Sequence, residues 1–158
     1  MEQINEKFAV WAEIDGFSKP VFELDITFGK LIDDIVYPYD HKEPFFIDGT
    51  PVKNEKIKRI KILQQGPGLK QALGYFNSDL TRGDMQKQKM YGEQYFIRIE
   101  DILRRHSVDV TAQVIKAFVQ TKTSIKDYLP NKQQVISSAT SIFVEALKLI
   151  NMNPNNNP

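Results

Sequence analysis

Basic side chains are the residues of this 158-residue sequence whose types and spacing best suit a chemical role, because they gather in two short groups. Cations that cluster on one face of a protein bind phosphates and other anions. The two groups are Lys53, Lys56, Lys58, Arg59 and Lys61, and Lys87, Lys89, Arg98, Arg104 and Arg105. The ligand- or phosphate-binding residues that we predict from them are Lys56, Lys58, Arg59, Lys61, Arg104 and Arg105.

Acidic residues stand close to both groups in the sequence, so a second interpretation stays open. Glu43, Asp48 and Glu55 lie close in the sequence to the first group, and Glu100 and Asp101 to the second. Neighbouring charges of opposite sign form ion pairs on a solvated surface and cancel the basic field. Ion pairs within the fold are therefore the alternative to an anion-binding surface.

No catalytic residue, metal ligand or cofactor site is predicted. His41 and His106 have no partner at a spacing that would orient them as catalytic bases or pair them as ligands. Asp48, Glu55 and Lys58 could be arranged as the acidic-plus-lysine set of a metal-dependent nuclease, but their spacing is loose and they fall in expected turns. A non-enzymatic role is the main expectation.

Composition places the chain among ordinary globular proteins. It is 41% hydrophobic and 26% charged, with a net charge of +1. Residues 1–66 contain nine Lys/Arg and twelve Asp/Glu, whereas residues 67–158 contain twelve and eight, an asymmetry too small for a dedicated nucleic-acid binder. Cysteine is absent, no run approaches the length of a membrane span, and the acidic N-terminus is unlike a signal peptide. These features predict a cytoplasmic protein without membrane attachment.

The first 65 residues predict a β-β-α-β-β sheet unit. Phe8, Val10, Ala12 and Ile14 alternate along one strand, and a turn at residues 15–20 leads to a second. We expect the second strand to place Phe22, Leu24 and Ile26 on one face. After it we expect a helix capped by Thr27 and ended at Pro38, a strand at residues 45–47 before an Asp-Gly turn, and a strand at residues 58–64.

The single helix of this unit is expected to cover the sheet with an apolar stripe formed by Leu31, Ile32, Ile35 and Val36. Trp11 lies on the opposite side of its strand from Val10. Because indole rings are usually buried, we expect Trp11 to pack against residues 31–36. On the last strand, Ile60 and Ile62 should face inward and Arg59, Lys61 and Leu63 the other way.

Residues 69–150 predict a four-helix bundle beyond a boundary at Gly66-Pro67-Gly68. The apolar stripes of the four helices are Leu69, Ala72, Leu73, Phe76 and Leu80; Phe96, Ile99, Ile102 and Leu103; Val110, Val114, Ala117, Phe118, Thr121 and Ile125; and Val135, Ile136, Ala139, Ile142, Phe143, Ala146, Leu147 and Ile150. Ser107 or Asp109 is expected to cap the third helix. Residues 151–158 should be a disordered tail or linker.

The last expected helix has a broad apolar face that could mediate self-association. Its candidate interface residues are Val135, Ile142, Phe143 and Leu147. A broad apolar face that a small bundle leaves uncovered is often an oligomer interface. The alternative is that residues 69–80 and 110–125 cover this face within one chain.

Three segments between residues 31 and 65 carry a resemblance to a known kind of module. They are Ile35-Val36 followed by Pro38-Tyr39, then Glu43-Pro44-Phe45-Phe46-Ile47-Asp48-Gly49, then Ile57-Lys58-Arg59-Ile60-Lys61-Ile62. This pattern resembles the N-terminal module that precedes effector domains, including TIR-like ones, in bacterial proteins linked to antiphage defence. The resemblance covers residues 1–65 and implies a sensing or regulatory role, and it carries over no catalytic residues.

We therefore expect an α+β protein that acts as a recognition or assembly module, binding a protein partner, a second copy of itself or a small anionic ligand. The alternative is a nucleic-acid-binding protein that uses the basic strand and helix-end groups, whose affinity would fall steeply with salt. A metal-dependent enzyme built on Asp48, Glu55 and Lys58 is a third hypothesis.

Overall fold

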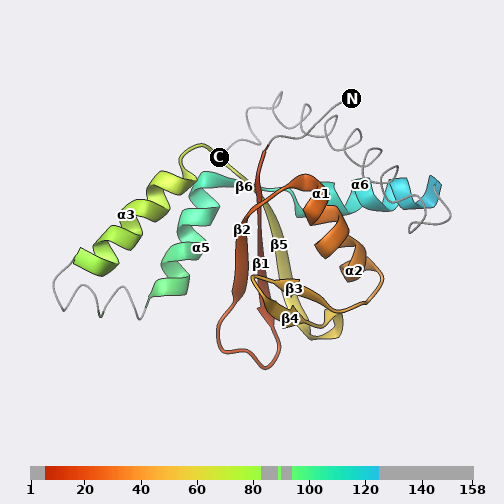
Figure 1. The fold of residues 1–158 in the computed structure, drawn as a ribbon, viewed down its shortest axis with the longest axis horizontal. Helices are drawn as coiled ribbons and strands as arrows, with labels where there is room; N and C mark the ends of the chain where they lie inside the picture. The colour runs from red at the N-terminus through yellow and green to blue at the C-terminus, as the bar shows by residue number, and fades with distance from the viewer. Residues whose placement is uncertain (1–5, 83–88, 90–93, 125–158) are drawn as a thin grey trace.

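The structure, a computed structural model, describes residues 6–82, 89 and 94–124. A central antiparallel sheet is covered by helices on both faces, and Figure 1 shows the sheet nearly edge-on between the two helical layers. The α+β class with an antiparallel sheet is thus confirmed. The elements are β1 Phe8–Ile14, β2 Val21–Ile26, α1 Phe28–Lys30, the π-helix η1 Leu31–Val36, α2 Tyr37–Asp40, β3 Phe45–Ile47, β4 Thr50–Val52, the 3-10 helix η2 Asn54–Lys56, β5 Ile57–Gln65, α3 Leu69–Arg82, α5 Tyr95–His106, β6 Ser107–Asp109 and α6 Thr111–Ser124.

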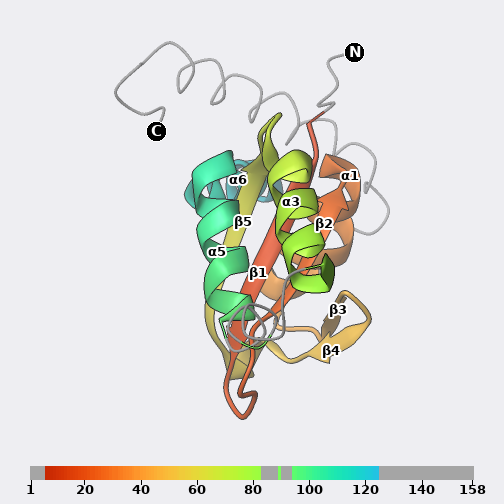
Figure 2. The same cartoon turned by 90° about the vertical axis from the view of Figure 1, so that its left-hand side faces the viewer.

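The sheet has the strand order β2-β1-β5-β6, and all neighbouring strands are antiparallel. Strand β1 is central, and every residue from Phe8 to Ala12 is buried. Such a strand is covered on both faces, which is why it carries a continuous apolar run where a one-sided sheet would show simple alternation. Figure 2, turned by 90°, shows α3 and α5 lying over β1, β2 and β5.

Ile26 does not lie on the face of the sheet that the sequence predicts, because β2 contains a bulge. Phe8 lies opposite Ile26 but Val10 lies opposite Glu23, so β2 has one more residue than β1 between these pairs. Asp25 adopts a left-handed φ of 60°, and its backbone N–H donates to the side chain of Gln65 at 2.7 Å. The extra residue reverses the alternation. Ile26 therefore packs on the same face as Phe8, while Phe22 and Leu24 lie on the opposite face.

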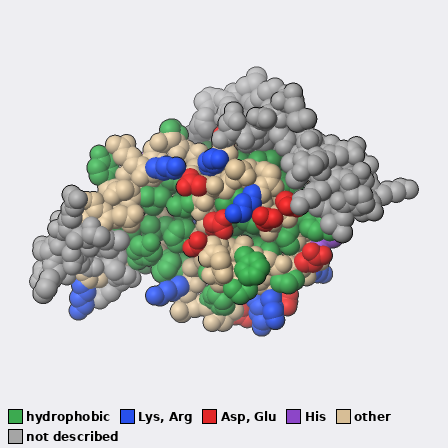
Figure 3. Space-filling view, in the orientation of Figure 1, with side chains coloured by type: hydrophobic (Ala, Val, Ile, Leu, Met, Phe, Trp, Pro, Cys, Tyr) green, Lys and Arg blue, Asp and Glu red, His purple; other side chains and the backbone are tan. Residues whose placement is uncertain are grey.

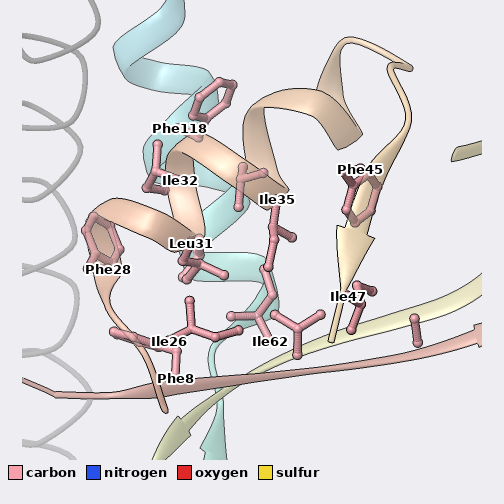
Figure 4. Packing of buried hydrophobic residues seen from close by; sticks show 14 of the residues in the cluster. Phe8, Ile26, Phe28, Leu31, Ile32, Ile35, Phe45, Ile47, Ile62 and Phe118 are labelled. Atoms are coloured by element: carbon pink, nitrogen blue, oxygen red, sulfur yellow. The ribbon is translucent and has the colours of Figure 1, made fainter. Parts of the chain in front are cut away.

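The larger apolar core fills the space between the sheet and the helical segment α1-η1-α2. Figure 4 shows Phe8, Ile26 and Ile62 of the sheet directed toward Leu31, Ile35 and Phe28 of that segment, with Phe45 and Ile47 of β3 closing one side. The expected stripe is confirmed, since Leu31, Ile32, Ile35 and Val36 are all at most 2% exposed. Thr27 caps α1 as predicted, because its Oγ1 accepts the backbone N–H of Lys30 at 3.3 Å.

The helical segment does not end at Pro38, as the sequence predicts, but continues to Asp40. A π-helical turn explains the difference. The backbone N–H of Tyr37 donates to Ile32 O, five residues back, and Pro38 then stands in the first turn of α2. The wider π-helical turn interrupts the regular hydrogen-bond pattern just before Pro38, so the proline is accommodated without ending the segment.

Residues 45–52 form a separate hairpin and do not join the main sheet. β3 pairs with β4 through the expected Asp48-Gly49 turn, in which both residues have positive φ, 49° and 76°. Such a turn matches the twist of a two-residue hairpin loop. The strand that completes the main sheet is instead β6, which pairs with residues 63–65 of β5.

The expected boundary at residues 66–68 does not separate two cores in the described residues. β6 joins the sheet, and Val110, Val114, Ala117 and Phe118 pack in the same cluster as Phe8. These four residues belong to the predicted apolar stripe of the third helix. Asp109, one of the two predicted capping residues, accepts the N–H of Thr111 through its Oδ1 at 3.0 Å. The third helix, α6, lies on the sheet because it begins soon after β6, and β6 is a strand of that sheet. The four-helix bundle remains a prediction, since its last helix lies outside the described residues.

Helices α3 and α5 cover the other face of the sheet. They contribute Leu69, Phe76, Ile99 and Leu103 to a second buried cluster, as their predicted stripes require. Trp11 belongs to this cluster, where its ring stacks on Phe22 with centroids 5.4 Å apart. The expectation that Trp11 packs against residues 31–36 was wrong, because helices cover both faces of β1 and odd-numbered residues face α3 and α5.

Candidate anion-binding cavity

A cavity of about 220 Å³ lies on the α5 side of the sheet, next to the second buried cluster. It is bounded by β1, β5, β6 and one face of α5. Its lining residues are Trp11, Arg59, Lys61, Leu63, Glu100, Leu103, Arg104, Ser107 and Asp109. Clefts that enclose a whole drug-sized ligand measure about 300–1,000 Å³. This cavity therefore suits a small polar group or one end of a longer ligand.

Two of the residues that line this cavity have a buried polar atom for which no described residue supplies a hydrogen-bond partner. They are Nε1 of Trp11 and Oγ of Ser107, whose residues are 3% and 7% exposed. Most buried polar side-chain atoms are paired, because a buried unpaired group costs about 1–3 kcal/mol. An indole N–H only donates, and a hydroxyl donates or accepts. Unused hydrogen-bonding capacity therefore lies directly behind the cavity surface, at two of the residues that line it.

Three cations that the sequence singled out surround the same cavity. Arg59 and Lys61 reach the cavity from β5. They lie on the face of this strand opposite to Ile60 and Ile62, as the sequence predicts. Arg104 reaches the cavity from the last turn of α5. The Lys61 side chain is only 17% exposed, and its Nζ lies 3.0 Å from Glu100 Oε2. An ammonium group carries three protons, so Lys61 has donors beyond this bond.

A salt-bridge fork holds Arg104 at the rim. Asp101 Oδ1 accepts from Arg104 Nη2 at 2.7 Å, and Asp101 Oδ2 accepts from Arg105 Nε at 2.9 Å. The hydrogen bond from Arg104 lowers the pKa of Asp101 below its usual value of 3.8, and the positive charges of Arg105 and Arg104 act in the same direction. Asp101 thus stays ionised at neutral pH and orients both guanidinium groups.

The other predicted binding residues lie elsewhere. Lys58 is the extra residue where β5 shifts against β1, and its Nζ lies 3.6 Å from Asp15. Lys56 ends η2, where its carbonyl accepts the N–H of Asp15. Arg105 lines a different, open hollow beside Gly66 and His106. The predicted interface residues Val135, Ile142, Phe143 and Leu147 lie outside the described residues, and so do Lys87 and residues 151–158.

Sequence reasoning did not select the other six lining residues, and Trp11 and Ser107 are the ones among them whose buried polar atoms matter for the site. Trp11 stands directly opposite Lys61 in the pairing of β1 with β5. Alternation alone puts Trp11, Lys61 and Leu63 on one face once that register is known. Ser107 offered no such pattern, because it lies in a three-residue strand directly after a helix and was expected to cap the next helix.

The structure does not assemble the metal-dependent set that was considered. The backbone N–H of Asp48 donates to Glu23, and Lys58 pairs with Asp15. Within the described residues, no group of three or more His, Asp or Glu side chains could hold a metal ion. Both histidines have packing partners: the His41 ring lies 4.0 Å from that of Tyr37, and the His106 ring lies against Gly68.

A larger hollow of about 550 Å³ lies between η1, α2, β2 and the β3–β4 hairpin. Its charged lining residues are Glu23, Lys30, Asp33, Asp34 and Glu43, so its charge is opposite to that of the first basic group. Across the face drawn in Figure 3, acidic and basic side chains of the described residues are interspersed. This face lacks the single-sign field of a nucleic-acid surface.

Comparison with known proteins assigns no family: no family model matches the chain, and no curated protein or solved structure matches it. Among the described residues, none of the helices has both the length and the apolar character that crossing a membrane requires.

Proposed function

We propose that this chain is a non-enzymatic recognition module, and that the cavity between β5, β6 and α5 is its binding site for an anionic group. The observation that carries the proposal is that Trp11 and Ser107 line the cavity beside Lys61, and that their buried Nε1 and Oγ atoms have no partner among the described residues. Hydrogen bonds in which one partner is ionised are stronger than neutral ones. A carboxylate or phosphate would therefore gain most from this set of donors.

The donors stand on rigid elements, which supports a binding role. Trp11 lies in the central strand and stacks on Phe22, and Ser107 lies in β6 directly after α5. Lys61 is held by Glu100 at 3.0 Å. Groups that are already fixed lose little conformational entropy when a ligand binds.

The setting in bacterial defence or stress response is part of the proposal and rests on the resemblance of residues 1–65. Several residues that carry the resemblance are core residues here, among them Ile35, Phe45 and Ile47. They support a shared way of folding more directly than a shared ligand. A cytoplasmic location belongs to the same proposal.

Trp11 is the only tryptophan in the chain, so it reports on the site directly. The test titrates acetate, glutamate and inorganic phosphate into the protein and follows Trp11 fluorescence and the NMR signal of its indole N–H. We expect at least one anion to shift both signals in a saturable way. Lys61→Met should lower the affinity for that anion at least tenfold, because the partly buried ammonium group is lost.

Lys58→Met is the matched control, since Lys58 lies on the same strand but pairs with Asp15 outside the cavity. It should leave the anion response unchanged. The proposal would be contradicted if none of the three anions changed the Trp11 signals of the folded protein. It would also be contradicted if Lys61→Met and Lys58→Met lowered the affinity for the anion equally. If a short single-stranded DNA binds with a steep salt dependence, and if Lys61→Met leaves its affinity unchanged, nucleic-acid binding becomes the favoured function.

A further inference from the structure

We infer that the natural ligand of this site is an extended acidic segment of another protein, which pairs with the open edge of β5 and places a carboxylate in the cavity. This inference rests on the proposed function and names its partner. It follows from the position of the cavity beside an incomplete strand pairing and from the side chains on either side of that edge.

Strand β5 is much longer than the partner on its outer side. It spans Ile57–Gln65, but β6 pairs only with residues 63–65. The N–H of Val110 donates to Ile62 O at 2.9 Å, and Thr111 Oγ1 accepts the N–H of Ile62 at 2.7 Å. The chain then leaves the edge, because α6 begins at Thr111.

Ile60 marks the part of this edge that stays open. It lies two residues before Ile62, so its backbone N–H and carbonyl point to the same outer side of β5. In the described part of the chain, no strand and no side chain forms a hydrogen bond with Ile60 on that side. An exposed strand edge with unpaired peptide groups is a site for adding an extended segment.

The two flanks of the edge differ in character, and this difference defines the partner. On the cavity side lie three cations, Arg59, Lys61 and Arg104, together with the two carboxylates of Glu100 and Asp109. On the other side, Ile60 and Ile62 lie next to Ile115 of α6 on an apolar surface whose hollow, about 10 Å³, is too small to enclose a side chain, so that aliphatic residues of a partner would cover it. Side chains of an added strand would alternate between these flanks. The matching segment therefore alternates Glu or Asp with aliphatic residues such as Val.

The size of the cavity agrees with this partner. At about 220 Å³ it suits one end of a ligand, and a carboxylate that enters it from the edge would lie among the side chains of Lys61, Trp11 and Ser107. In such complexes the main-chain hydrogen bonds supply affinity, and the pockets for alternate side chains supply specificity.

The experiment uses the full chain and four eight-residue peptides. One alternates Glu and Val, and one alternates Lys and Val. The other two are Glu-Val peptides that are N-methylated on one or the other set of alternate amides. An extended strand points only one of these sets toward β5. Binding is followed by Trp11 fluorescence and by hydrogen exchange of the Ile60 amide.

We expect the Glu-Val peptide to shift Trp11 and to slow exchange of the Ile60 amide at least tenfold, and the Lys-Val peptide to do neither. One methylated peptide should lose at least tenfold in affinity, while its counterpart should bind like the unmodified peptide. If both methylated peptides bind equally well, or if free anions shift Trp11 but no peptide does, the strand-pairing inference is wrong and the anion site stands. If neither anions nor peptides shift Trp11, the proposed function itself fails.

Discussion

The two faces of the central sheet are built differently. The face under α1-η1-α2 and α6 is a continuous apolar cluster in which Phe8, Leu31, Ile32 and Phe118 are completely buried. The face under α3 and α5 is smaller and includes two buried polar atoms without partners, next to a cavity with charged walls. We therefore expect the first face to contribute more to stability than the second, where two buried polar atoms have no partner among the described residues.

The largest effect is expected from the apolar face. Phe118→Ala removes a fully buried ring from α6 and should lower the free energy of unfolding by about 3–5 kcal/mol, measured by urea denaturation. Val119→Ala is the control, because the neighbouring side chain is exposed and should change stability by less than about 1 kcal/mol. Equal effects of the two changes would show that α6 does not stabilise the sheet.

A pair of glycines tests how tightly the second face is packed. A Cβ added to Gly66 would lie 2.6 Å from the carbonyl oxygen of His106, where the chain enters β6. Gly66→Ala should therefore cost about 1–3 kcal/mol through overpacking. Gly74→Ala, in α3, meets no atom within 4 Å and should stabilise the protein by about 0.5–1 kcal/mol. Thermal unfolding checks both, and a neutral Gly66→Ala would mean that β6 can separate from β5 at no cost.

Ser107→Ala tests whether the unpartnered groups reduce stability. Removing a buried hydroxyl that has no partner should raise the free energy of unfolding by about 1 kcal/mol. The same change should weaken anion binding, which is the pattern of a site that trades stability for function. Ser18→Ala, in the exposed β1–β2 turn, should alter neither property. A loss of stability in Ser107→Ala would mean that its hydroxyl already has a partner.

The smallest effect concerns the rim of the cavity. The pKa of Asp101 is lowered in the folded state, so the stabilisation that it provides is present above the unfolded value of 3.8 and is lost as pH falls through the folded pKa. Arg104→Gln removes the main hydrogen bond and should move the pKa of Asp101 back toward 3.8. An NMR titration of the Asp101 carboxyl carbon measures this shift, and an unchanged titration would assign the effect to Arg105 alone.

Local sequence patterns determined most of the individual elements. The alternation in β1, the apolar stripes of residues 31–36, 96–103 and 110–118, the Thr27 cap and the Asp48-Gly49 turn all appear where the sequence places them. These features depend on neighbours within a few residues, and their period or turn chemistry can be read directly.

The candidate site was predictable only in part. Arg59, Lys61 and Arg104 were selected as a cationic set from two distant segments, and the structure brings them to one cavity. Trp11 and Ser107 were not selected, because their role depends on the register of β1 with β5 and on β6. Long-range pairing has no local sequence pattern when one strand is only three residues long.

By itself, the sequence determined an α+β protein, the periodicity of its elements and a set of basic residues with acidic neighbours. Only the tertiary structure decided which face of the sheet each helix covers, that β6 completes the sheet, and that the bulge at Asp25 places Ile26 with Phe8. The physical reason is that an apolar stripe in the sequence predicts that this side of the helix is buried, but it does not specify which part of the chain buries it. What covers it is decided by contacts between residues as far apart in the sequence as Tyr37 and Phe118.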